Sequence, residues 1–235
     1  MSFSVHKAEQ RGKAEHGWLH ANFSFSFSEY YNPFRMGFGD LRVINDDIIE
    51  PHSGFGMHPH HDMEIITIIE EGELTHEDSY GHKGSIKRGE IQYMRAGNGI
   101  MHSEFNHGNT PVNSFQIWIK PKLLKVQPTY EQRSFSDFND KNHLVKLISP
   151  DGAENSIEIN QDAYIYSAHI DANSFINLHE TPKGFGLLLF VVNGSIQIGE
   201  YELHKRDELQ IVDEGQIEVK AVEDTHIIVF EVRVV

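Results

Sequence analysis

The sequence contains no cysteine among its 235 residues. Disulfide bonds, thiolate metal ligands and a cysteine nucleophile are therefore excluded, and nothing indicates an oxidising compartment. Long apolar runs are also missing. No stretch approaches the roughly 20 apolar residues of a membrane helix, and residues 1–9 lack the apolar core of a signal peptide. We therefore expect a cytoplasmic protein without a membrane partner.

Basic residues are scarce, since 20 Lys and Arg stand against 35 Asp and Glu, a formal net charge of −15. They form no Lys/Arg cluster of the kind that a nucleic-acid surface requires. We therefore expect no direct contact with nucleic acid. The length suits one large β domain or two domains of ordinary size.

Histidine, by contrast, is abundant, with 16 residues, and two pairs have the spacing of metal ligands. His58 and His60 are two residues apart, and so are His102 and Glu104. Side chains two apart on a strand point to the same side. We expect three imidazoles and a carboxylate to converge on a metal ion. Regular alternation would also place Glu64 on the face of His58 and His60, so the spacing leaves two carboxylates in competition.

Most of the other histidines have no partner at ligand spacing, and for these we expect ordinary surface or hydrogen-bonded roles. They are His6, His16, His20, His52, His76, His82, His107, His143, His204 and His226. His61 should point away from the site.

This set of ligands favours catalytic over structural metal chemistry. Neutral imidazoles and one carboxylate bind divalent iron, copper, nickel or zinc. Four protein ligands leave positions open in an octahedral shell, and an open position is typical of a catalytic site. The remaining charge of about +1 would favour an enolate, a phenolate or activated oxygen. Iron or copper would indicate oxygen insertion, and zinc would indicate Lewis-acid chemistry.

Short alternating segments separated by glycine turns predict an all-β barrel or sandwich. Phe23, Phe25 and Phe27 alternate with small polar residues, and we expect them in the core of a strand over 21–28. Gly72 and Gly194 should each form the turn of a hairpin. The predicted strands cover 21–28, 41–47, 64–69, 73–78, 86–94, 112–120, 163–166, 187–192 and 195–198.

A repeated pattern predicts two related barrels. Residues 205–210 resemble residues 87–92, and each segment follows a glycine, Gly194 or Gly72, at a similar distance. We place the N-terminal barrel at 1–121, a polar connector with room for a helical turn at 122–142, and the C-terminal barrel at 143–235. Counting from Gly194, the second half carries Glu180, Pro182 and Gly186 where the first half has His58, His60 and Glu64.

The same residues resemble the motifs of the cupins, G-(x)5-H-x-H-(x)3,4-E-(x)6-G and G-(x)5-P-x-G-(x)2-H-(x)3-N. The spacings His58-x-His60-(x)3-Glu64 and Gly99-(x)2-His102-(x)3-Asn106 fit them. The departures are His52 for the first glycine, one extra residue before Gly72, Gly97 for proline and Ile91 for the second motif's glycine. Within the cupins, the sequence is most similar to the pirins. The matching segments are 16–18, 25–27, 41–47, 54–60, 97–104 and 116–119.

The resemblance implies two cupin barrels in tandem with a metal only in the N-terminal one. It implies the ligands His58, His60, His102 and Glu104, with Glu64 not coordinating, and iron(II) as the usual metal; copper, nickel, manganese and zinc are alternatives. It also implies quercetin 2,3-dioxygenase activity, in which O2 opens the ring of a flavonol. Glu104 would then also act as the catalytic base.

Other pirins imply a different role, a metal-bearing, redox-sensing co-regulator that binds protein partners without turnover. We accordingly expect a monomer that binds a small aromatic, flavonol-like substrate and O2, or else a protein partner.

Overall fold

The computed structural model describes residues 2–212 and 215–234. The chain is almost entirely β-strand, with only two short 3-10 segments among these residues, η1 (Ala8–Gln10) and η2 (Ala153–Asn155). The all-β prediction is confirmed. Within the described residues, no helix has the length and apolar character needed to cross a membrane.

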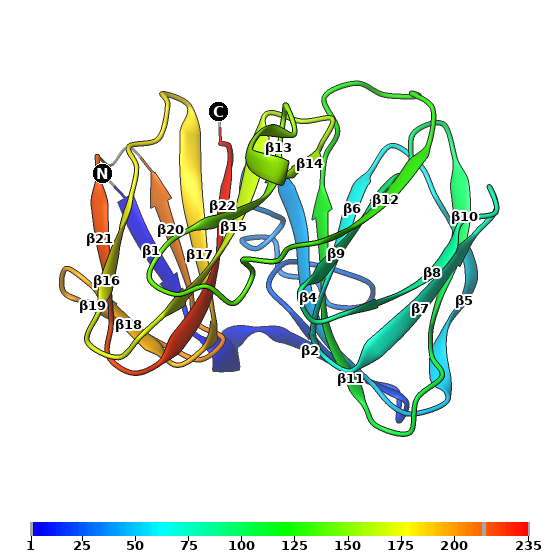
Figure 1. Cartoon of the computed structure of the whole chain (residues 1–235), viewed down its shortest axis with the longest axis horizontal. Helices are drawn as coiled ribbons and strands as arrows, with labels where there is room; N and C mark the ends of the chain where they lie inside the picture. The colour runs from blue at the N-terminus through cyan, green and yellow to red at the C-terminus, as the bar shows by residue number, and fades with distance from the viewer. Residues whose placement is uncertain (1, 213–214, 235) are drawn as a thin grey trace. The chain divides into compact units, whose positions relative to one another are not determined.

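The chain forms two compact units, one of which we call the N-terminal barrel (residues 12–135 and 159–161). It consists of a seven-stranded sheet in the order β12-β9-β6-β11-β4-β3-β2 and a four-stranded sheet in the order β5-β10-β7-β8. Figure 1 shows the four-stranded sheet along one side of this unit. The strands are β2 (Gly12–Glu15), β3 (Leu19–Phe23), β4 (Leu41–Ile49), β5 (Ser53–His60), β6 (Glu64–Glu71), β7 (Glu73–Asp78), β8 (Lys83–Lys87), β9 (Glu90–Arg95), β10 (Ile100–Asn106), β11 (Val112–Ile119) and β12 (Thr129–Ser134).

The second unit, the C-terminal barrel, contains the described residues of 2–11, 136–158 and 162–234. Its sheets have the orders β1-β20-β17-β22-β15-β13-β14 and β16-β21-β18-β19. The strands are β1 (Ser2–His6), β13 (Val145–Ser149), β14 (Ile157–Glu158), β15 (Ala163–Ile170), β16 (Phe175–Leu178), β17 (Phe185–Asn193), β18 (Ser195–Ile198), β19 (Tyr201–His204), β20 (Glu208–Val212), β21 (Ile217–Ala221) and β22 (Thr225–Arg233).

The two barrels share one topology. The run β9-β6-β11-β4 corresponds to β20-β17-β22-β15, and β5-β10-β7-β8 corresponds to β16-β21-β18-β19. Because both sheets match in order, the duplication indicated by the sequence extends over the whole barrel. At the sheet edge, β12 pairs with β9 in one barrel as β1 pairs with β20 in the other. The N-terminal strand therefore belongs to the C-terminal barrel, where the sequence predicted contiguous ranges.

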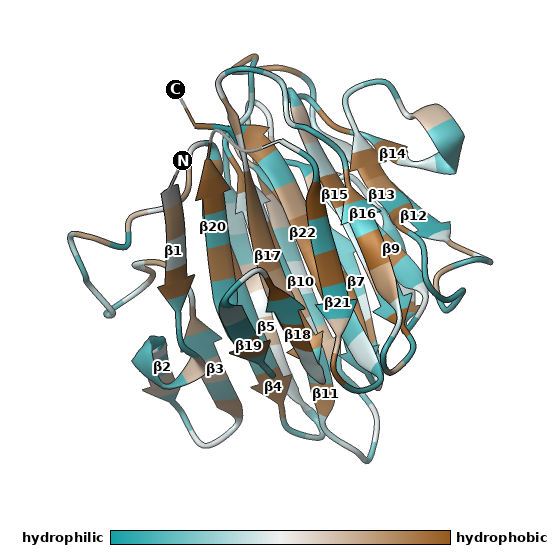
Figure 2. Cartoon of the chain, turned by 90° about the vertical axis from the view of Figure 1, so that its left-hand side faces the viewer, coloured by the Kyte–Doolittle hydropathy of each residue, from teal (hydrophilic) through white to brown (hydrophobic). Residues whose placement is uncertain are grey.

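Alternating burial along the strands generates each core. Strand β10 alternates between buried and more exposed residues along its length, and so does β21. Figure 2 shows the corresponding bands of hydrophobic and hydrophilic colour along the strands. Strands β6 and β17 are instead buried on both faces over most of their length, as their continuous apolar sequences indicate.

Gly72 and Gly194 do not form hairpin turns, contrary to the prediction. Strand β6 pairs with β9 and β11, whereas β7 pairs with β8 and β10. The chain therefore passes from one sheet to the other at Gly72, and it does so again between β17 and β18 at Gly194. Both glycines have positive φ, 86° and 83°, which L-residues rarely adopt. A single glycine between two strand patterns is typical both of a bend between sheets and of a hairpin turn. The sequence alone therefore could not distinguish the two.

Two further predictions need correction. The strand expected over 21–28 ends at Phe23. Phe23 and Phe25 are buried core as expected, whereas Phe27 is only partly buried. The connector at 122–142 contains strand β12 where a polar linker was expected, and a turn, without a helix, at residues 136–139.

Gly54 allows β5 to approach β10 closely, and this yields a test. A Cβ at Gly54 would lie 2.2 Å from the carbonyl oxygen of Glu104, whereas nothing lies within 4 Å of one at Gly56. We expect Gly54→Ala to lower the free energy of unfolding by about 1–3 kcal/mol because β5 must move away from β10. Gly56→Ala, on the same strand, should change it by less than about 0.5 kcal/mol. Urea unfolding measures both, and equal stabilities would contradict the close approach.

Candidate metal centre

Three histidines converge inside the N-terminal barrel. Strands β5 and β10 run antiparallel, and His58 lies directly opposite His102. The ring centroids of His58 and His102 are 4.4 Å apart, and that of His60 is 4.8 Å from His58 and 4.9 Å from His102. One potential ligand atom from each ring lies within 4.8 Å of the others. The expected convergence of the three imidazoles is therefore present.

The nitrogen atoms of the three rings are placed to bind a cation. His58 Nδ1 lies 2.7 Å from the Gly56 carbonyl oxygen and donates to it, so Nε2 is the nitrogen available to a metal ion. The Nε2 atoms of His60 and His102 are buried and have no hydrogen-bond partner. Burial, followed by the neighbouring histidines, lowers the pKa of His60 to about 4 and that of His102 to about 2. These two rings are therefore neutral at physiological pH, as metal ligands must be.

Glu104 is fully buried beside His102. A backbone irregularity between His102 and Glu104 shifts the register with β5. Thr67 Oγ1 lies 3.4 Å from one carboxylate oxygen of Glu104, and Gln116 Nε2 donates to the other at 2.8 Å. Burial raises the pKa of Glu104 to about 7 although both donors lower it. Without a cation this carboxyl group is about half protonated at neutral pH, so a divalent cation would displace a proton on binding.

Glu64 lies away from this cluster and holds the barrel together. Its carboxylate accepts a short hydrogen bond from Tyr93, accepts another from Asn160 N at 3.2 Å, and forms an ion pair with Arg95 at 3.7 Å. It belongs to neither group of potential metal ligands among the described residues. The sequence spacing left Glu64 and Glu104 as equal candidates for the carboxylate ligand. In the structure, the Glu64 carboxylate is instead engaged by Tyr93, Asn160 and Arg95.

His76, for which the spacing predicted no role, lies directly behind the site. It is buried on β7, and together with His102 and Glu104 it forms a second group of potential ligands. Its Nδ1 lies 3.4 Å from His102 Nδ1 and 3.1 Å from Gln92 Nε2. If His102 coordinates through Nε2, its Nδ1–H can donate to His76, and this fixes the ring of His102.

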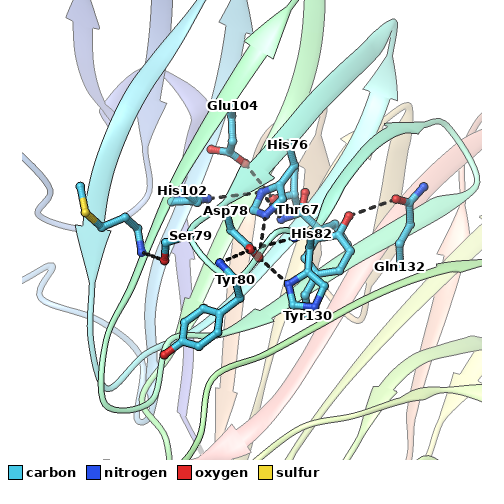
Figure 3. A network of polar contacts seen from close by, with 12 residues as sticks. Thr67, His76, Asp78, Ser79, Tyr80, His82, His102, Glu104, Tyr130 and Gln132 are labelled. Carbon is cyan, nitrogen blue, oxygen red and sulfur yellow. Dashed lines mark hydrogen bonds and ion pairs between the residues drawn. The ribbon is translucent and has the colours of Figure 1, made fainter.

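From His76 a polar network reaches the surface (Figure 3). His76 Nε2 lies 3.6 Å from Asp78, and Asp78 accepts a 2.8 Å hydrogen bond from Nδ1 of the exposed His82. The ring of Tyr130 stacks on both histidines, with centroid distances of 4.8 and 5.2 Å. The only sequence signal for this network was the two-residue spacing of His76 and Asp78.

A row of polar residues on the opposite sheet supports the ligands. Asn45, Gln116, Thr67 and Gln92 lie directly opposite one another on β4, β11, β6 and β9, so they share one face. Thr67 and Gln116 contact Glu104, whereas Gln92 contacts His76. Side chains of the seven-stranded sheet therefore contact the candidate ligands that the four-stranded sheet carries.

A cavity of about 580 Å³ opens beside the histidines, a size typical of small-molecule sites. His58, His60 and Glu104 line it, and so do Asn45, Asp47 and Gln116. Its walls are mainly aromatic, formed by Trp18, Phe23, Phe27, Phe55 and Trp118. Phe23 belongs to the core as expected and also lines this cavity. Phe27, which was expected in the core, is partly buried and lines the cavity.

The corresponding strand pair of the C-terminal barrel is apolar on its buried face. Leu178 on β16 lies opposite Ile217 on β21, whereas Glu180 and Pro182, which the count from Gly194 aligned with His58 and His60, follow the end of β16. All three residues Leu178, Ile217 and Val219 belong to the apolar core of that barrel. Among the described residues, groups of three or more potential ligands occur only in the N-terminal barrel.

Fold and site together define a metal-binding cupin protein with two barrels. Residues 4–119 match the family model "Pirin", and residues 146–232 match the model "Quercetinase C-terminal cupin domain". The chain belongs to the pirin family, and the resemblance seen in the sequence is confirmed.

Similar proteins cover nearly the whole chain. It is 40% identical over 230 residues to a quercetin 2,3-dioxygenase of Escherichia coli K12, covering 97% of each chain. It is 37% identical to a pirin-like protein of Caulobacter vibrioides, covering 95% of this chain and 96% of that one. A crystal structure of the E. coli pirin YhhW in complex with nickel(II) superimposes with a TM-score of 0.94 at 38% identity, covering 100% of both chains.

The two candidate carboxylates can be distinguished by substitution. We expect Glu104→Gln to weaken Ni²⁺ binding more than about 100-fold, because a charged oxygen next to the histidines is lost. Glu64→Gln should leave the affinity unchanged but lower the free energy of unfolding by about 1–3 kcal/mol, because the partners of a buried carboxylate are lost. Calorimetric titration and urea unfolding measure the two quantities. A loss of Ni²⁺ affinity in Glu64→Gln alone would reverse the assignment.

Gln116 orients Glu104, since its Oε1 accepts from Trp118 Nε1 at 3.1 Å while its Nε2 donates to the carboxylate. We expect Gln116→Leu to weaken Ni²⁺ binding about 10–100-fold, as is usual for residues that hold a ligand in place. The exposed Gln127→Leu is the control and should bind Ni²⁺ like the unmodified protein. Equal affinities in both variants would show that Glu104 needs no support from Gln116.

Proposed function

We propose that this protein is a metal-dependent dioxygenase that opens the ring of a quercetin-like flavonol with O2. The observation that carries the proposal is a cluster of three histidines at one end of an aromatic cavity, with the buried carboxylate of Glu104 beside one of them, His102. The similarity to E. coli quercetin 2,3-dioxygenase supports the same reaction class.

We assign His58, His60, His102 and Glu104 as the ligands of one divalent metal ion. Iron(II) is the metal we propose; the similar pirin structure in complex with nickel(II) supports a divalent transition metal in this protein. The metal would supply a Lewis acid and a redox partner for O2 in this cavity. It would reside only in the N-terminal barrel, since the corresponding strand pair of the other barrel is apolar on its buried face.

The protein's own residues bind the flavonol and prepare it for reaction. The aromatic walls of the cavity would stack on its flat rings and exclude water from the reacting carbons. Trp118 contacts His60 edge to face, with ring centroids 4.9 Å apart, and so limits how the substrate lies over the histidines.

Glu104 is the group that we propose takes the proton of the flavonol 3-hydroxyl. Its carboxylate lines the cavity beside His58 and His60, within the part of the site where a hydroxyl group of the substrate would lie. Deprotonation produces the flavonolate, which carries the electrons that O2 accepts. Ring opening then releases carbon monoxide.

The reaction can be tested with iron-loaded protein and a matched pair of variants. We load the metal-free protein with Fe(II) under argon, add quercetin and then air, and follow the flavonol absorbance together with released carbon monoxide. We expect turnover in the unmodified protein and a loss of at least about 100-fold in His58→Ala, because one ligand is missing. His61→Ala is the control: the His61 side chain is 82% exposed and lies outside the cluster, so its activity should persist.

Turnover no faster than with free iron would contradict the proposal, as would undiminished turnover in His58→Ala. A tightly bound metal without any turnover would favour the alternative role, a metal-bearing co-regulator.

A further inference from the structure

The side chain of Asn45 makes no hydrogen bond although it is almost completely buried. It is 3% exposed, it lies on β4, and it lines the cavity beside the histidines. Its Oδ1 is buried without a hydrogen-bond partner. A buried amide without a partner destabilises the folded protein. If this position served only the stability of the fold, we would expect an apolar side chain here.

The cross-strand neighbours of Asn45 make no hydrogen bond to its side chain. Gln116 directs its amide to Glu104 and Trp118, donating to the first and accepting from the second. Phe23, the partner on the other side, offers only a hydrocarbon ring. Since Asn45 lines the cavity, a ligand in the cavity can supply the partner.

The position of Asn45 restricts the chemistry of that occupant. An amide can donate from Nδ2 and accept at Oδ1, as a phenolic hydroxyl can also donate and accept. Asp47, two residues further along β4, lines the same cavity and adds a carboxylate. The walls in between are aromatic. A flat ring bearing hydroxyl groups matches both features.

Asn45 is also within reach of a ligand held at the metal centre. Asn45 and Gln116 are directly opposite each other on neighbouring strands, about 5 Å apart at Cα, and Gln116 contacts Glu104. One three-ring ligand can therefore contact both the proposed base and the Asn45 amide.

We propose that Asn45 is a specificity-determining residue that binds a hydroxyl group on an aromatic ring of the substrate, away from the reacting 3-hydroxyl. The site thereby selects polyhydroxylated flavonols over unsubstituted ones. This inference rests on the proposed function for the identity of the ligand, but it concerns binding and is tested without turnover.

The test uses zinc-loaded protein under argon and two ligands, quercetin and 3-hydroxyflavone. Both carry the 3-hydroxyl and the 4-carbonyl group, but only quercetin carries further hydroxyls. The chain has two tryptophans, Trp18 and Trp118, and both line the cavity, so quenching of their fluorescence reports binding. We expect Asn45→Leu, which has a similar volume, to weaken quercetin binding about tenfold. Binding of 3-hydroxyflavone should change less than about twofold, because that ligand has no hydroxyl for Asn45 to bind.

Thermal unfolding separates this role from a structural one. Leucine removes an unpaired buried polar group, so Asn45→Leu should unfold at the same temperature as the unmodified protein or at a higher one. Asn113→Leu on β11, outside the cavity lining, is the control and should not change the preference for quercetin. Equal weakening of both ligands, or unchanged quercetin binding, overturns the proposal.

The outcome also separates this inference from the proposed function. If Asn45→Leu selectively weakens quercetin binding but the iron-loaded protein shows no turnover, the Asn45 proposal is supported and the dioxygenase proposal is contradicted. If the protein turns over quercetin but Asn45→Leu does not change the preference for quercetin over 3-hydroxyflavone, only the Asn45 proposal is contradicted. If neither flavonol binds the unmodified protein, both proposals fall.

Discussion

The metal centre depends on the antiparallel pairing of β5 with β10. Side chains alternate across a strand, so His58 and His60 project to the interior together, and the pairing places His58 opposite His102. A shift of one residue would turn both histidines of β5 away from the cavity. Gly54 permits the close approach of the two strands, and the irregularity after His102 sets the register in which Glu104 stands. These two local backbone features therefore determine the positions of the side chains in the candidate site as well as the pairing of the strands.

The four-stranded sheet carries the candidate ligands, and side chains of the seven-stranded sheet hold them in position. Its polar row reaches across the barrel, where Thr67 and Gln116 contact Glu104 while Gln92 contacts His76. Buried polar groups are costly unless they are bonded, so each member of the row has a partner that explains it, except Asn45. That exception coincides with the cavity wall, where a ligand can supply the partner.

The two barrels show how one topology divides its tasks. Leu178 and Ile217 in the C-terminal barrel meet across the strand pair that corresponds to the pair carrying His58 and His102. Apolar residues on this strand pair extend a continuous core, whereas the histidines of the N-terminal barrel leave a cavity in its place. The C-terminal barrel thus has a continuous apolar core, whereas the N-terminal barrel contains the cavity and the histidine cluster.

The sequence by itself determined the all-β class, the duplication, the pirin resemblance and the convergence of His58, His60 and His102, because alternation and two-residue spacing are local properties. It could not tell a sheet-to-sheet bend at Gly72 from a hairpin, since both need the same positive φ. It could not place β1 in the C-terminal barrel, nor separate Glu64 from Glu104 by spacing. Only the tertiary structure decided these points and brought His76, Gln116 and Asn45 to the site, because cross-strand neighbours are set by register between segments far apart in the chain.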